Sequence, residues 1–411
     1  MTHTVIRRPG ARRRSVAAAV LLIAGLALTT ASAPVSAGAP VPSPRDPHGG
    51  LLPKGNGVWM YDSVHAGAGY GQLTLPGMWA PELNSYNQAA GKGHGISVLF
   101  SYGTDVEMYC PDLDPTQCTP DDLDVYYTPD GSGAQSTQAY AEHARVIGAR
   151  PVVSPVIDGR VGADYLTGFN DLSPSLARSF ADKVAAQVCA DPRVDGIQFD
   201  IEPFDISTAN GQYYFYLQIA KDFAGAHGNG RGRDPYRCVG PEHPQGRFFS
   251  IFTFARSIQA GTVSATHMQQ IVNGYHNGYV IDSLYDLADT PGGTFNPVAA
   301  YTSAVDTEVA NMKSWADMLK IPYGMGIPAA SSAHEYSQCV GPACQPASAG
   351  APMLEYTQAA LAAMDAHSVR ADHLYLGTDV WDLSSIDTDS DYNKLPATAP
   401  STVLSYLQQH L

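Results

Sequence analysis

Eight short runs rich in apolar residues recur along this 411-residue chain, and amphipathic segments separate most of them. The strand-like runs are 57–62, 96–102, 150–157, 195–202, 247–254, 280–286, 321–327 and 373–381, and the helix-like segments are 135–146, 174–190, 212–226, 305–319 and 354–367. Strands that alternate with helices are typical of parallel βαβ units, and eight such units close into a barrel. The sequence therefore predicts an α/β protein built as a single (β/α)8 TIM barrel.

The N-terminal segment is expected to lie outside this barrel. Five arginines at positions 7 to 14 precede an apolar run over 16–28, and small residues follow up to Ala37. This order is typical of a secretory signal peptide, and the apolar run is too short to span a bilayer. We expect a signal peptide over 1–37, a lead-in rich in Pro, Gly and Ser over 38–54, and the catalytic barrel over 55–411. Residues 328–372, between the last two strands, are too few for a large insertion domain.

The net charge indicates which partners the protein can bind, and the cysteines indicate disulfides. The net charge of −15 becomes −20 when the signal peptide, which holds five arginines and no acidic residue, is removed. An acidic surface disfavours nucleic acid and anionic membrane and suits a neutral substrate. Six cysteines in an exported chain indicate up to three disulfides. The simplest pairing is Cys110 with Cys118, Cys339 with Cys344 and Cys189 with Cys238.

No metal and no cofactor are predicted. The cysteines are not spaced with histidines as a zinc site requires. Residues 387–393 begin like a calcium-binding loop, but Tyr392 stands where that loop needs glycine and Thr398 where it needs glutamate. We also expect the protein to be a monomer.

The fourth strand carries acidic groups in an unusual position. With alternating side chains, Ile197 and Phe199 point to one face, while Gln198, Asp200 and Glu202 point to the other. Strands of a parallel sheet are normally covered by apolar groups on both faces, and burial of unpaired carboxylates is costly. Acids at the carboxyl end of a barrel strand therefore indicate catalysis. The alternative interpretation is a strand end whose acids are merely solvated.

Other strands also end in groups that suit an active site. The sixth ends in Tyr285 and Asp286, and the eighth in Trp381 followed by Asp382. The segment from Asp195 to Glu202 resembles the D-x-x-D-x-D-x-E motif of the family 18 glycoside hydrolases, the chitinases and endo-β-N-acetylglucosaminidases.

Further motifs of that family have counterparts here. Residues 283–286 are similar to the sixth-strand M-x-Y-D with the methionine replaced, residues 381–387 to the eighth-strand tryptophan with its acids, and residues 324–328 to the seventh strand. Two positions depart from the pattern: Gln198 replaces the middle aspartate, and residues 154–157 keep only the serine of the third-strand S-x-G-G.

The resemblance implies a retaining hydrolase that cleaves β-1,4 linkages of N-acetylglucosamine-containing glycans by substrate-assisted catalysis. In this interpretation Glu202 protonates the leaving oxygen, and Asp200 steadies the 2-acetamido group as its oxygen attacks. Tyr285 holds that oxygen in line, and Trp381 stacks beneath the sugar. These three roles for Glu202, Asp200 and Tyr285 are catalytic.

The remaining candidates are assigned to binding or structure. Gln198 and Asp286 join Trp381 as substrate-binding candidates, whereas Asp195 and Gly196 are structural positions of the motif. Because a glutamine cannot take up the charge of Asp200, we expect Asp200 to stay ionised and to raise the pKa of Glu202 by like-charge repulsion.

Two other functions remain open. Gln198 and the altered third strand would also suit a carbohydrate-binding barrel that has lost catalysis. A glycosidase of another specificity could instead use a carboxylate pair, such as Glu202 with Asp105 or Asp286. Chitin and the core of N-glycans are equally compatible with the motifs.

Overall fold

Eight parallel strands form the centre of the molecule. The computed structural model describes residues 50–60, 86–88, 95–109, 114–127, 150–160, 169–192, 194–199, 201, 204–226, 234–287, 298–328, 337–340, 343–346, 353–381 and 400–410, all within one compact unit. The strands are β1 (Asn56–Met60), β2 (Ile96–Tyr109), β4 (Arg150–Arg160), β5 (Gly196–Phe199), β6 (Phe248–Thr253), β7 (Gly278–Ser283), β8 (Tyr323–Pro328) and β11 (Tyr375–Trp381). They are the eight strands that the sequence predicted.

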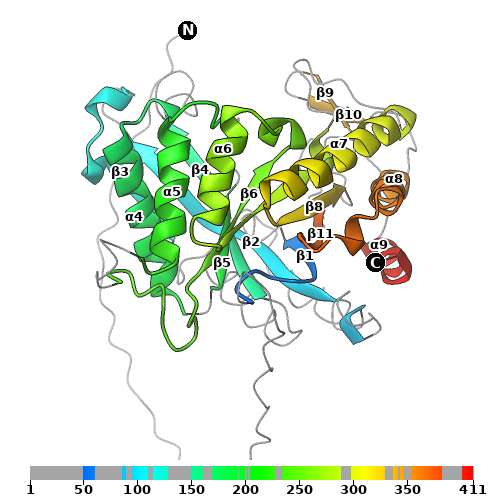
Figure 1. Ribbon diagram of the computed structural model, residues 1–411, viewed down its shortest axis with the longest axis horizontal. Helices are drawn as coiled ribbons and strands as arrows, with labels where there is room; N and C mark the ends of the chain where they lie inside the picture. Colours follow the sequence, from blue (N-terminus) through cyan, green and yellow to red (C-terminus); the bar gives the residue numbers. More distant parts are fainter. Residues whose placement is uncertain are drawn as a thin grey trace, which may run out of the picture. The chain divides into compact units, whose positions relative to one another are not determined.

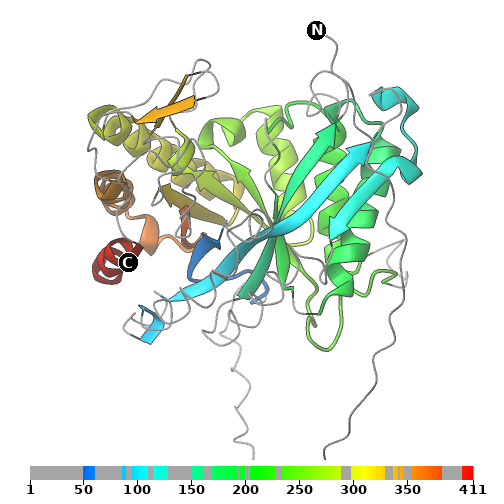
Figure 2. The same cartoon turned by 180° about the vertical axis from the view of Figure 1, so that it is seen from behind.

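The strands pair in chain order, and the first pairs with the last. Each of them lies parallel to its neighbours, and β1 pairs with both β2 and β11. The ring of pairings is therefore closed, which is consistent with a (β/α)8 barrel. Figure 1 shows the sheet curling from β4 and β5 towards β8 and β11, and Figure 2 shows the long β2 from behind.

Within the described parts of the chain, helices follow six of the eight strands and lie on the outside of the sheet (Figure 1). They are α4 (Pro174–Ala190), α5 (Gly211–Phe223), α6 (Val263–Asn273), α7 (Val298–Leu319), α8 (Met353–Ala366) and α9 (Pro400–His410). The helix α4 begins as predicted, since Ser173 accepts a hydrogen bond from the Leu176 N–H at 3.2 Å and Pro174 takes the first position. The helices α6 and α9 were not predicted, and the predicted helix at 135–146 lies outside the described residues.

Short elements complete the fold. The strand β3 (Leu123–Tyr127) pairs antiparallel with β2, after the 3-10 turns η4 (Pro115–Gln117) and η5 (Pro120–Asp122). Three more 3-10 turns, η6 (Ala255–Ile258), η7 (Leu284–Asp286) and η9 (Val369–Ala371), lie at strand ends. Among the described helices, none combines the length and the apolar character that crossing a membrane requires. The predicted signal peptide lies outside the described residues.

One predicted disulfide is present. Cys189, at the end of α4, is bonded to Cys238, with the two Cα atoms 4.7 Å apart. Cys118 is also disulfide-bonded, and its predicted partner Cys110 lies outside the described residues. The hairpin of β9 (Ser337–Val340) and β10 (Ala343–Pro346) sets position 339 directly opposite position 344, as the third predicted pairing requires of the backbone.

Candidate functional site

The described site residues meet at the carboxyl ends of the barrel strands. Trp59 lies near the end of β1, Gln198 near the end of β5, Tyr285 directly after β7, and Trp381 at the end of β11. Asp200 and Glu202 lie outside the described residues, as does the side chain of Asp286. The structure thus brings together three predicted residues, Gln198, Tyr285 and Trp381, and adds Trp59, which the sequence analysis did not single out.

Tyr285 and Trp381 form a stacked pair. Their ring centroids are 4.9 Å apart and their planes differ by 12°. Tyr285 is buried, with 7% of its surface exposed, whereas Trp381 is half-buried. Phe252, from β6, contacts the Tyr285 ring from another side, at a centroid distance of 6.1 Å. Tyr285 therefore helps to pack the barrel interior, whatever else its hydroxyl does.

Trp59 links this pair to β5. Its ring meets Tyr285 at 5.7 Å and Trp381 at 5.5 Å, edge to face in both cases, and it stacks on Phe100 at 4.4 Å. Its indole N–H donates a long hydrogen bond, 3.4 Å, to Oε1 of Gln198. Only 1% of Trp59 is exposed, so the side chain is fully buried beside the site.

Gln198 is held on both sides of its amide. Its Oε1 accepts the bond from Trp59, and its Nε2 donates to the backbone oxygen of Phe199 at 2.7 Å. The side chain is 3% exposed. A carboxylate in this position could accept from Trp59 but could not donate to Phe199 O, so the two contacts together suit an amide.

Glycines make the room for these side chains. A Cβ on Gly326, in β8, would stand 2.8 Å from the Tyr285 ring, and a Cβ on Gly57, in β1, would stand 2.2 Å from Oδ1 of Asp379. The register places Gly57, Asp379 and Gly326 side by side across β1, β11 and β8. Small residues in this row therefore let Tyr285 and a buried acid enter the barrel interior.

That acid, Asp379, was not predicted as a site residue. It precedes Trp381 by two residues, so it faces the same side of β11, one layer deeper. It is 3% exposed, and burial raises its pKa well above the ordinary value, while a hydrogen bond from the Gly57 backbone opposes the shift. Asp379 is therefore a proton-holding acid beneath the site.

Besides Asp379, a pair of buried acids lies on the outer face of the barrel wall. Asp282, in β7, faces Glu308 of α7, and Oε1 of Glu308 accepts a hydrogen bond from the Ala255 N–H at 2.7 Å. Burial, followed by the charge of Glu308, raises the pKa of Asp282 well above its ordinary value. Burial also raises the pKa of Glu308. The two carboxyl groups consequently share a proton, which joins α7 to the ends of β6 and β7.

Asp195 lies directly before β5, at the opposite end of that strand from Gln198. Its Oδ1 is 2.8 Å from Nε2 of His243, and both residues line a polar pocket of about 290 Å³ with Glu242 and Gln245. The next residue, Gly196, approaches the backbone closely, because a Cβ there would stand 2.4 Å from Phe248 O. Both positions therefore shape the start of β5.

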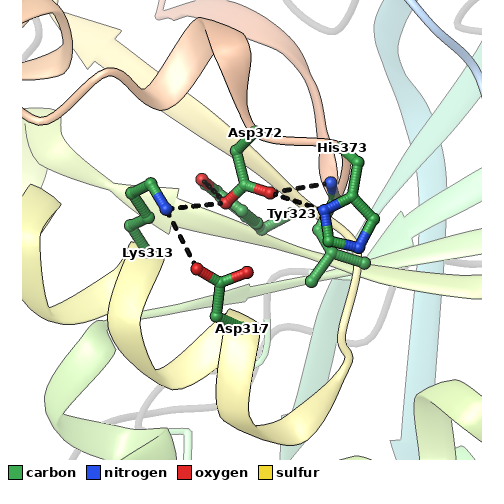
Figure 3. Close-up of polar contacts among 6 residues, drawn as sticks. Lys313, Asp317, Tyr323, Asp372 and His373 are labelled. Atoms are coloured by element: carbon green, nitrogen blue, oxygen red, sulfur yellow. Dashed lines mark hydrogen bonds and ion pairs between the residues drawn. The ribbon is translucent and has the colours of Figure 1, made fainter.

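The described residues offer one cluster that could hold a metal ion: Asp317, Asp372 and His373 (Figure 3). It lies at the amino ends of β8 and β11, away from the site. Lys313 already contacts both carboxylates, at 2.9 Å for Asp317 and 3.5 Å for Asp372, and the Tyr323 hydroxyl donates to Asp372 at 2.9 Å. The lysine ammonium supplies the positive charge that these acids need. The segment 387–393 lies outside the described residues.

Comparisons with known proteins show the fold. No family model and no curated protein matches the chain. A glycoside hydrolase family 5 enzyme from Prevotella bryantii B14 is 14% identical, with a TM-score of 0.50 over 90% of this chain and 99% of its own. A GH18 chitinase from Pseudoalteromonas aurantia is 11% identical, with a TM-score of 0.47 over 86% and 99%. The chain thus has a barrel fold that glycoside hydrolases use, and the resemblance to family 18 stays a prediction.

Proposed function

We propose that the protein is a secreted glycoside hydrolase that cleaves β-1,4 linkages of N-acetylglucosamine-containing glycans by substrate-assisted catalysis. The observation that carries the proposal is the meeting of Gln198, Tyr285 and Trp381 at the carboxyl ends of three strands. These are the strand ends at which barrel enzymes hold their active sites. The sequence motif that ends in Glu202 continues from the same strand end as Gln198.

The stacked pair supports a sugar subsite with a defined side. The Tyr285 ring lies parallel to one face of the Trp381 indole, so a sugar can stack only on the opposite face. Aromatic faces are good platforms for the apolar side of a pyranose, because both surfaces are flat and poorly hydrated. The half-buried state of Trp381 is compatible with this use.

The chemistry is assigned from the motif. Glu202 protonates the glycosidic oxygen, and the 2-acetamido oxygen of the substrate attacks the anomeric carbon to form an oxazolinium ion. Asp200 stabilises the acetamido N–H and its positive charge, and the Tyr285 hydroxyl donates to the acetamido group. Water, deprotonated by Glu202 as the base, then attacks the anomeric carbon and opens the oxazolinium ring, so the product retains its configuration.

The experiment is a product analysis with one matched variant. The purified protein and its Glu202→Gln variant are incubated with chitin oligosaccharides and with a high-mannose glycoprotein, and products are followed by mass spectrometry. Cleavage by the wild type alone supports the proposal and identifies the substrate. Turnover of glycans that lack the acetamido group would instead indicate a two-carboxylate glycosidase. Recovery of a mature chain that begins near Gly38 from the culture medium tests secretion.

Gln198 favours one second candidate, a carbohydrate-binding barrel without catalysis. Its neutral amide is fixed by Trp59 and by the backbone of Phe199, whereas the family motif has an acid at this position. Saturable binding of chitin oligosaccharides with no cleavage, equal in the wild type and in Glu202→Gln, would select this function.

A further inference from the structure

Trp59 stands between the two halves of the candidate site. Its indole N–H donates to Gln198 of β5, and its ring makes edge-to-face contacts with Tyr285 and Trp381. The side chain is buried, with 1% exposed, so it has no surface to offer a sugar.

We propose that Trp59 is a positioning residue of this site. It orients the Gln198 amide through its N–H, and it orients the Tyr285–Trp381 pair through its ring. The inference rests on the proposed function, because what is positioned is the sugar subsite and the strand end that leads to Glu202.

The physical basis is the cost of breaking a buried hydrogen bond. A buried indole N–H or amide oxygen that loses its partner retains the cost of its desolvation. Trp59 and Gln198 therefore constrain one another, and the amide also has to keep its bond to Phe199 O. Since Trp59 packs against Tyr285 and Trp381 edge to face, a rotation of its ring would displace both.

The test compares substitutions on the two sides of this hydrogen bond. Trp59→Phe keeps an aromatic ring and removes the donor, Gln198→Met removes the acceptor and leaves Trp59 in place, and Gln198→Glu keeps an acceptor. Trp315→Phe is the matched control, because Trp315 is a half-buried tryptophan on α7 that packs against the core. Activity on the substrate identified above is measured as kcat and KM. The circular dichroism signal that arises from coupling between the Trp59 and Trp381 rings reports their relative orientation, and thermal unfolding reports stability.

We expect Trp59→Phe and Gln198→Met each to lower kcat on the order of tenfold, the effect of one unsatisfied buried polar group, with KM changed less than twofold. Gln198→Met should also weaken the circular dichroism signal of the Trp59–Trp381 pair. Gln198→Glu keeps the acceptor for Trp59 but loses the bond to Phe199 O, so it should recover that signal in part. The double variant should lose less than the product of the single losses. If Trp59→Phe does not fold, the two Gln198 variants decide the question.

Several outcomes would overturn the inference. A variant that only melts at a lower temperature, with unchanged kcat in its folded range, assigns Trp59 a purely structural role. Equal losses in Trp315→Phe would show a general effect of tryptophan removal. Normal cleavage by the wild type with unaffected Trp59 and Gln198 variants overturns this inference and leaves the proposed function intact. A wild type that neither binds nor cleaves glycans overturns both.

Discussion

The shared proton of Asp282 and Glu308 makes the stability of the fold depend on pH. The hydrogen bond between Asp282 and Glu308 raises the pKa of Asp282 and lowers that of Glu308, whose Oε1 also accepts from the Ala255 N–H at 2.7 Å. Asp282 is therefore the protonated partner, and Glu308 is the acceptor. Substitution Asp282→Asn replaces this proton by an amide N–H of similar shape, which donates to Glu308 at every pH.

The sign of the effect follows from the raised pKa of Asp282. The unfolded chain releases this proton at about pH 4, whereas the folded protein retains it to higher pH. The proton therefore stabilises the fold fully below about pH 4, and this contribution is lost as the pH rises towards the folded pKa. While one additional proton is held, the free energy of unfolding falls by about 1.4 kcal/mol per pH unit.

The assay is urea unfolding between pH 4 and pH 8 with disulfides intact, followed by far-ultraviolet circular dichroism. We expect the free energy of unfolding of the wild type, relative to Asp282→Asn, to fall with the slope given above. Asp379 is present in both proteins, so its own raised pKa cancels in the difference. Glu355→Gln is the control, because Glu355 is an exposed acid in the first turn of the neighbouring helix α8. Parallel curves for the wild type and Asp282→Asn would refute the shared proton.

Three further predictions concern packing, catalysis and the disulfide. Gly326→Ala should lower the free energy of unfolding by about 1–3 kcal/mol, because its Cβ would meet Tyr285, whereas Gly240→Ala has open space and should change little in the same urea titration. Tyr285→Phe keeps the stacked ring and should leave the melting temperature nearly unchanged, while kcat on a chitin oligosaccharide falls on the order of 100-fold. Replacing both Cys189 and Cys238 by alanine should cost about 4 kcal/mol for a loop of 49 residues, measured by denaturant unfolding.

Periodicity in the sequence was sufficient for most of the fold. All eight strands were predicted, because strands such as β6 are buried on both faces and therefore consist of nearly continuous apolar residues. The helix α6 was missed although its buried residues Ala265, Met268, Ile271 and Val272 follow the helical spacing. Its start was also marked, because Thr262 accepts a hydrogen bond from the Ala265 N–H at 3.2 Å.

The candidate site was predicted only where a motif pointed to it. Gln198, Tyr285 and Trp381 belong to strands with family motifs, and the structure brings them together. Trp59 belongs to the first strand, for which no motif was available. Its role depends on pairings between β1, β11 and β2 that local periodicity does not specify. The alternation within β1 could have shown that Trp59 and Gly57 share a face, but not which side chains would meet there.

The rule that selected Asp200 and Glu202 also applies to Asp282 and Asp379. Each is an acid within a buried strand, and each requires an explanation for the cost of burial. The structure supplies different explanations. Asp282 points outwards and shares a proton with Glu308, and Asp379 points inwards but lies one layer below Trp59 and Trp381. A buried acid on the inner face therefore indicates catalysis only when it lies at the last inward position of its strand, because deeper acids are closed off from substrate by the side chains above them.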